Sequence, residues 1–137
     1  MKTKKEVDDL SYKIIGCAIE VHRHLGPGLL ESVYEKCLMQ ELTLNNIKYR
    51  SQVKTDIHYK GIDLNTDLRL DLLVEDTIVV ELKAVEVMNP LFTAQLLSYM
   101  QILQKPKGIL INFNCVNVFN DGQKTLVNEH YAVLEKE

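Results

Sequence analysis

The stretch IVVELKAVE, residues 78–86, places a carboxylate and an amine inside an otherwise apolar run that predicts a buried strand. Successive side chains of a strand face opposite ways, so Glu81 and Lys83 lie on one face together with Val79. Polar groups in a buried strand need partners. The two residues therefore either form a structural ion pair or take part in chemistry.

The preceding run DLRLDLLV (67–74) is separated from this strand by three residues, which predicts a β-hairpin. If Val74 pairs with Ile78, counting back along both strands places Asp71 directly opposite Glu81. Two facing carboxylates repel each other and destabilise a sheet unless something neutralises them. The period of two also predicts which side chains of this strand share a face: Leu68, Leu70 and Leu72 on one, and Arg69, Asp71 and Leu73 on the other.

A divalent cation with oxygen ligands would neutralise Asp71 and Glu81. Such a metal binds a water molecule and lowers its pKa, and Lys83 would position that water or steady a phosphate under attack. The alternative is a plain salt bridge that joins Arg69 or Lys83 to Asp71 or Glu81 on a half-solvated face. The pattern alone favours the salt bridge, because short motifs recur by chance.

The remaining sequence predicts a single domain, 1–137, of the α/β class with a mixed central sheet flanked by helices. Two amphipathic helices come first, and Gly26-Pro27-Gly28 separates them. Asn89-Pro90 is a good cap and first turn for a later helix. The predicted ranges are helices over about 6–24, 29–45 and 90–104, and strands over 48–59, 67–74, 78–85, 108–114 and, at the end, near 129–134.

The helices supply further candidate site residues. Glu31 and Tyr34 are neighbours on one helix face, although an acid in a first helical turn is also ordinary, because of the helix dipole. Gln95 is predicted to project from the same buried stripe as Tyr99, where a glutamine needs a partner. That partner would be a metal-bound water, a nucleic-acid phosphate or a loop carbonyl. The histidines show no metal-ligand spacing, but His22 or His24 could line a cleft beside the Gly-Pro-Gly turn.

The composition excludes several classes of protein. The net charge of −3 and the pI of about 5.8 argue against a broad basic face that coats nucleic acid. Three scattered cysteines without ligand spacing argue against zinc and redox roles and indicate a reducing compartment. No apolar run is long enough for a membrane span, and no signal core follows the basic N-terminus. We therefore expect a cytoplasmic protein that does not bind membranes.

The segment EVHRHLGPGLLESVYE (20–35) contains the spacing Gly28-x-x-Glu31-x-x-Tyr34. It resembles the signature of the small bacterial and archaeal GxxExxY family, which is placed in the PD-(D/E)XK nuclease superfamily. The likeness implies a restriction-endonuclease-like core of helix, three strands, helix and strand (αβββαβ) behind an extra N-terminal helix. It continues in order through RLDLLV (69–74), VVELKAVE (79–86), AQLLSYM (94–100) and GILINFN (108–114).

The resemblance also implies roles for individual residues. Asp71 matches the aspartate of the superfamily motif, with Leu70 in place of the preceding proline, and Glu81 and Lys83 match its E-x-K. Glu31 matches an acidic residue of the helix before the sheet. Gln95 and Tyr99 resemble the Q-x-x-x-Y helix motif of exonuclease-like branches. The expected metal ligands are thus Glu31, Asp71 and Glu81.

The function expected from these residues is phosphodiester hydrolysis by a Mg²⁺- or Mn²⁺-dependent nuclease that acts on DNA rather than RNA. We also expect Tyr34 and Arg69 to contact the substrate. The alternative is a catalytically silent module with a nuclease fold, which binds nucleic acid or a protein partner. The acidic pI and the short chain favour this alternative modestly, and either protein could work as a homodimer.

Overall fold

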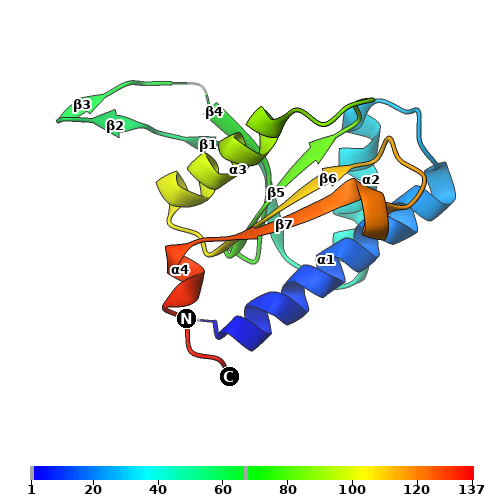
Figure 1. Ribbon diagram of the computed structural model, residues 1–137, viewed down its shortest axis with the longest axis horizontal. Helices are drawn as coiled ribbons and strands as arrows, with labels where there is room; N and C mark the ends of the chain where they lie inside the picture. Colours follow the sequence, from blue (N-terminus) through cyan, green and yellow to red (C-terminus); the bar gives the residue numbers. More distant parts are fainter. Residues whose placement is uncertain (1, 67) are drawn as a thin grey trace.

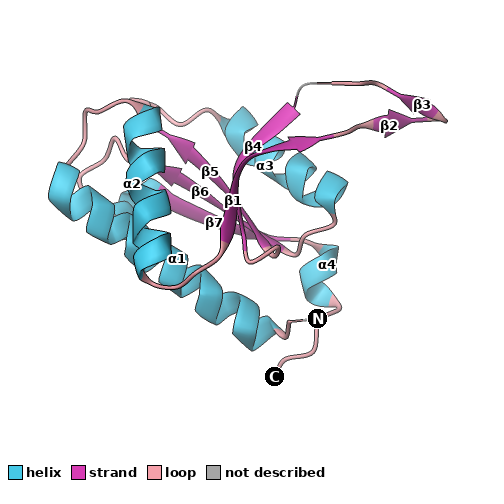
Figure 2. Cartoon of the chain, turned by 180° about the vertical axis from the view of Figure 1, so that it is seen from behind, coloured by secondary structure: helices cyan, strands magenta, loops and turns pink. Residues whose placement is uncertain are grey.

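The computed structural model describes residues 2–66 and 68–137, which form a five-stranded mixed sheet with helices on both faces (Figures 1 and 2). The predicted fold class is confirmed, with α1 as the extra N-terminal helix. Asp67, the first residue of the predicted strand 67–74, lies outside the described residues. In chain order the elements are α1 (Lys4–Leu25), α2 (Glu31–Leu44), β1 (Tyr49–Thr55), β2 (His58–Tyr59), β3 (Ile62–Asp63), β4 (Leu68–Val74), β5 (Ile78–Lys83), α3 (Pro90–Leu103), β6 (Lys107–Asn112), η1 (Val118–Gly122), β7 (Gln123–Val127) and α4 (Glu129–Ala132).

The strand order of the main sheet is β1-β4-β5-β6-β7. Strands β5 and β6 are parallel and joined through α3, whereas the other neighbours are antiparallel. The strand predicted from the apolar run 108–114 is confirmed as β6, which is buried along its whole length. One core cluster lies between the sheet and helices α1 and α2, and a second lies under α3 on the opposite face.

Local sequence signals explain where the helices begin. The Thr3 side chain accepts a hydrogen bond from the Glu6 amide, and the Glu6 carboxylate accepts one from the Thr3 amide, which forms a capping box. As predicted, the Asn89 side chain caps α3 by accepting from the Leu91 amide, with Pro90 in the first turn. Within the described ranges, no helix is long and apolar enough to cross a membrane.

Two predicted strands differ from the structure. The strand predicted near 129–134 is wrong, because Asn128 caps a short helix there and the last strand, β7, lies earlier in the chain. The strand predicted over 48–59 is divided: β1 ends at Thr55, and β2 pairs with β3 in a separate hairpin. We call residues 56–66 the arm, because this hairpin projects away from the sheet (Figures 1 and 2).

The first turn of α1 and the C-terminal segment lie close together (Figure 1). The Lys4 amide donates to the Glu135 carbonyl over 2.7 Å, and the Lys5 amide donates to the Lys136 carbonyl over 3.0 Å. These amides belong to the first turn of α1, where N–H groups have no partner within the helix. The C-terminal segment therefore supplies acceptors to the start of the first helix.

Candidate active site

Asp71 and Glu81 lie where the ladder between β4 and β5 ends. The last pair is Leu72–Val80, so the predicted register is confirmed up to the residues beside the two acids. The Asp71 amide donates to Glu81 Oε1 over 3.1 Å, and the Leu82 amide donates to Asp71 Oδ2 over 2.8 Å. Each carboxylate thus accepts from the backbone of the facing strand, and these bonds fix both side chains between the strands.

Strands β1 and β4 are kinked together at Asp71. Their pairing is interrupted at Gln52, which lies opposite Asp71 in the register and has a left-handed φ of 50°. Leu72 packs in the core under α1 and α2, whereas Leu70 and Leu68 pack in the core under α3. The prediction that these three leucines share a face is therefore wrong, because the kink breaks the alternation of the strand.

Burial and a like charge perturb Glu81. Glu81 is only 6% exposed to solvent. Burial raises the pKa of Glu81 to about 8, with a further contribution from the Asp71 carboxylate, while the Asp71 amide and the Lys83 ammonium act in the opposite direction. Without a cation, this shift favours the protonated form of Glu81. A cation placed at these two carboxylates would take the place of that proton.

Glu31 is the first residue of α2, and its carboxylate interacts electrostatically with Asp71 and Lys83. Burial raises its pKa, the Asp71 carboxylate raises it further, and Lys83 lowers it. These electrostatic interactions link the helix to both strands of the hairpin. The structure therefore brings the candidate residues Glu31, Asp71, Glu81 and Lys83 into one cluster of interacting charges.

Tyr34 holds the turn that precedes α2. Its hydroxyl donates to the Gly26 carbonyl over 2.6 Å and accepts from the Leu29 amide over 3.2 Å. Its ring is fully buried and stacks on Phe113, with centroids 4.5 Å apart. The structure thus contradicts the substrate contact predicted for Tyr34, because a fully buried ring does not reach a substrate. The residue instead fixes where α2 begins, and so where Glu31 lies.

Helix α3 covers the other side of the site. The Lys83 ammonium lies 4.4 Å from the centroid of the Phe92 ring, a cation–π contact. Tyr99 is buried, and burial raises its pKa, with contributions from the Glu81 and Asp71 carboxylates; a hydrogen bond with Gln95 lowers it. Gln95 is exposed and does not lie in the buried stripe, contrary to prediction. Its partner is Tyr99.

Comparison with known proteins agrees with this geometry. A family model of the PD-(D/E)XK nuclease superfamily matches residues 8–125, which span α1 to β7. The chain belongs to the PD-(D/E)XK nuclease superfamily. No curated protein and no solved structure matches it. Membership of this superfamily supports a nuclease-type function and, because its members are generally dependent on divalent metals, a metal requirement.

The residues present fit the divalent metal that the PD-(D/E)XK assignment implies. Asp71 and Glu81 offer only oxygen atoms, which hard cations prefer, and burial makes their mutual repulsion costly. In residues 2–66 and 68–137 no group of three or more histidine, cysteine or acidic side chains is already arranged around a common point for a metal. Metal binding would therefore require these side chains to rearrange.

Three residues near the PD-(D/E)XK site were not singled out from the sequence. Glu35 is half-buried, and burial and the Asp71 carboxylate raise its pKa. Gln52 donates to Glu35 over 2.7 Å. Asn112 is buried beside Lys83 and bonds both the amide and the carbonyl of Val85, which fixes the chain just after Lys83. Glu35 was detectable from its place four residues after Glu31, on the same helix face.

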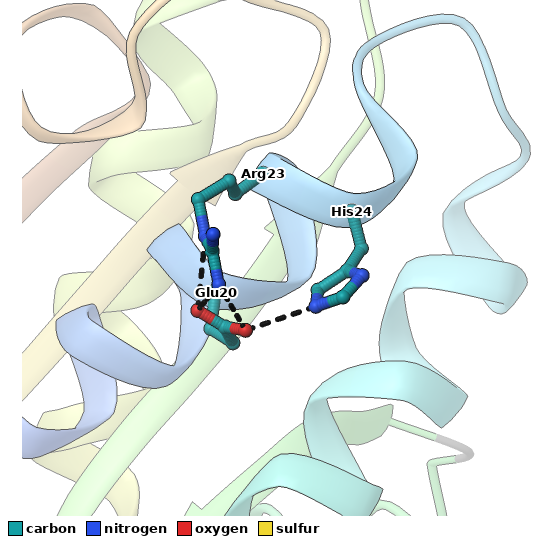
Figure 3. Close-up of polar contacts among 3 residues, drawn as sticks. All are labelled: Glu20, Arg23 and His24. Atoms are coloured by element: carbon teal, nitrogen blue, oxygen red, sulfur yellow. Dashed lines mark hydrogen bonds and ion pairs between the residues drawn. The ribbon is translucent and has the colours of Figure 1, made fainter.

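His22 and His24 make their contacts outside this cluster. The His22 ring donates to the Cys115 carbonyl over 2.8 Å. Figure 3 shows the His24 ring directed at Glu20, whose carboxylate also accepts two-pronged hydrogen bonds from Arg23. Arg69 is exposed on β4 and pairs with Lys54 of β1 in the register. Neither histidine therefore contributes to the candidate active site.

Proposed function

We propose that this protein is a nuclease that hydrolyses phosphodiester bonds with Mg²⁺ or Mn²⁺, in DNA rather than RNA. One observation carries the proposal: two carboxylates, the half-buried Asp71 and the buried Glu81, are held between adjacent strands beside Lys83. A structural salt bridge would place Lys83 on one of these acids, but its ammonium lies over the Phe92 ring. The arrangement favours a site for a cation over an ion pair that steadies the hairpin.

In this mechanism Glu31, Asp71 and Glu81 hold the metal. When bound, the metal lowers the pKa of a water molecule and offsets the charge of the phosphate. The Lys83 ammonium then orients the attacking water or steadies the phosphate. The hydrogen-bonded pair of Gln95 and Tyr99 orients the water or the substrate strand.

The shape of the arm supports DNA as the substrate. A two-stranded ribbon fits the major groove of B-form DNA, whereas the major groove of A-form RNA is too narrow for side chains to read. The arm is such a ribbon, and it continues from β1 and β4 (Figure 2). Arg69 at its base and Lys60 at its tip are cations that can contact phosphates.

Three further assignments belong to this proposal. The turn at Gly28, followed by Glu31 and Tyr34, supports membership of the GxxExxY subfamily. The three reduced cysteines support a place in the cytoplasm. A homodimer is supported by α3, which carries no charged residue and exposes Leu91 and Leu97. Sedimentation of the purified protein tests the dimer.

Cleavage assays test the proposed activity. Purified protein is incubated with single- and double-stranded DNA and RNA in Mg²⁺, Mn²⁺ or EDTA. We expect metal-dependent cleavage of DNA, which Asp71→Ala and Lys83→Ala lower by about 100-fold or more. Asp76→Ala is the matched control, because Asp76 is an exposed acid in the loop of the same hairpin. Equal cleavage in EDTA, or full activity of Asp71→Ala, contradicts the proposal.

One observation favours the silent binding module as a second candidate. Each of the two central carboxylates already accepts a backbone hydrogen bond, so Asp71 and Glu81 can be satisfied without a metal. For this module we expect binding of DNA in EDTA, measured by fluorescence anisotropy, and no cleavage in any metal. Cleavage that needs both Asp71 and Lys83 excludes it.

A further inference from the structure

Gln52 has an unusual backbone conformation for a strand residue. Its φ of 50° lies in the left-handed region, which disfavours residues with a Cβ atom. It is also the residue of β1 that faces Asp71, between the pairs Ser51–Leu72 and Val53–Leu70. A strained conformation persists only where surrounding contacts hold it, so the backbone of Gln52 requires such a contact.

That contact comes from α2. The Gln52 side-chain amide donates to Glu35 Oε1 over 2.7 Å, and this bond joins the kinked strand to the helix that carries Glu31. Glu35 lies one helical turn after Glu31, so both carboxylates lie on the same side of α2. Both also interact electrostatically with Asp71. The hydrogen bond therefore spans the gap between the edge of the sheet and the helix, beside the candidate active site.

We propose that the Gln52–Glu35 hydrogen bond is a latch that holds the shared kink of β1 and β4, and that both residues thereby position Asp71 in the candidate active site. A regular ladder would pair Asp71 with Gln52 through the backbone and restore the alternation of β4. The kink instead leaves the Asp71 amide directed at Glu81 and the Asp71 carboxylate at the Leu82 amide. The catalytic meaning of the latch rests on the proposed function, but its effect on Asp71 does not.

Two substitutions at Gln52 separate the kink from the amide group. Gln52→Ala removes the amide and keeps a Cβ atom that disfavours the left-handed region, so the kink should relax. Gln52→Gly removes the same amide, but glycine adopts positive φ readily, so the kink should persist. Glu35→Ala removes the acceptor and should act like Gln52→Ala, and the double alanine variant should add little to either. Lys54→Ala, at an exposed position two residues along β1, is the control.

The first measurement uses the metal-free protein. The Leu82 amide proton reports the hydrogen bond to Asp71, so its NMR chemical shift, followed through a pH titration, shows where the Asp71 carboxylate lies. We expect the shift and its titration to change in Gln52→Ala and Glu35→Ala and to stay near wild type in Gln52→Gly and Lys54→Ala. An unchanged Leu82 signal in Gln52→Ala overturns the proposal, as does an equal change in Gln52→Gly. Circular dichroism confirms that each variant is folded.

The second measurement is the affinity for Mn²⁺ by calorimetry. Residues that orient metal ligands typically contribute about 10-fold or more to affinity, so we expect this loss in Gln52→Ala and little loss in Gln52→Gly. If wild type binds no Mn²⁺, the proposed function fails, while the Leu82 signal still decides the role of the latch. If Asp71→Ala abolishes binding and Gln52→Ala leaves it intact, the site stands and the latch is refuted.

Discussion

Replacing Asp71 with asparagine should make the metal-free protein less sensitive to rising pH. The Asp71 carboxylate is one of the causes that raise the pKa of Glu81, after burial. Asparagine has nearly the same shape and keeps an oxygen that can accept from the Leu82 amide. The substitution therefore removes a charge and leaves the hydrogen bond between the strands in place.

The expected size follows from linkage between protonation and folding. The pKa of Glu81 rises from an ordinary 4.5 to about 8 on folding, so between these values the folded protein keeps a proton that the unfolded chain has lost. The free energy of unfolding therefore falls as pH rises through this window, in total by on the order of 5 kcal/mol at 1.36 kcal/mol per pH unit. A neighbouring charge commonly shifts a pKa by about one unit, so Asp71→Asn should recover about 1–2 kcal/mol near pH 8.

Urea denaturation in EDTA, followed by far-UV circular dichroism between about pH 5 and pH 8, measures this difference, because the chain has no tryptophan. Groups whose pKa values are the same in wild type and in Asp71→Asn contribute equally to both pH slopes, so they cancel when the slopes are compared. Glu31 and Glu35 contribute with the same sign, since Asp71 raises their pKa values too. Asp76→Asn is the control. Equal pH slopes for wild type and Asp71→Asn, or a wild type that gains stability over this range, refute the reasoning.

Three further predictions concern stability, and urea denaturation tests each of them. Tyr34→Phe keeps the stack on Phe113 but removes the hydroxyl bonded to Gly26 and Leu29, and should lower the free energy of unfolding by about 1–3 kcal/mol; no loss would mean that the turn does not depend on this hydroxyl. Gly16→Ala, in open space within α1, should raise it by about 0.5–1 kcal/mol. Gly108→Ala should lower it by about 1–3 kcal/mol, because a Cβ atom there would lie 2.6 Å from Met100 Sδ; a stabilised variant would contradict this packing.

The central hairpin was predictable because its register depends on a short loop and a hydrophobic pattern. A three-residue connection fixes the pair Val74–Ile78, and counting from it places Asp71 beside Glu81. The start of α3 was predictable for a similar reason, since Asn89 and Pro90 are residues that favour a helix N-terminus by their own chemistry. Local signals of this kind require no knowledge of distant contacts.

The kink was not predictable, because nothing in the identity of Gln52 signals a left-handed backbone. The contact that holds it comes from Glu35, which is 17 positions away in the sequence and lies in another element. The alternation rule therefore failed at Asp71, the residue on which the site depends most. The role of Tyr34 was missed for the same reason, since its partners Gly26 and Phe113 are brought to it only by the fold.

The last strand was predicted in the wrong place because two local signals compete in the same segment. The apolar residues of the segment 129–134 favoured a strand, but the Asn128 side chain accepts from the His130 and Tyr131 amides and starts a helix instead. The actual strand, β7, has a weak pattern, and its pairing with β6 determines it. Tertiary pairing overrides such weak propensities.

The bonds between the start of α1 and the last residues of the chain have a practical consequence for handling the protein. Terminal residues are usually the first to fray and the safest to trim or extend. Here the carbonyls of Glu135 and Lys136 accept hydrogen bonds from the amides of Lys4 and Lys5, which have no partner within the helix. The two ends therefore unravel together. Trimming the final residues, or attaching an affinity tag directly to them, would loosen the opening turn of the longest helix from the opposite end of the sequence.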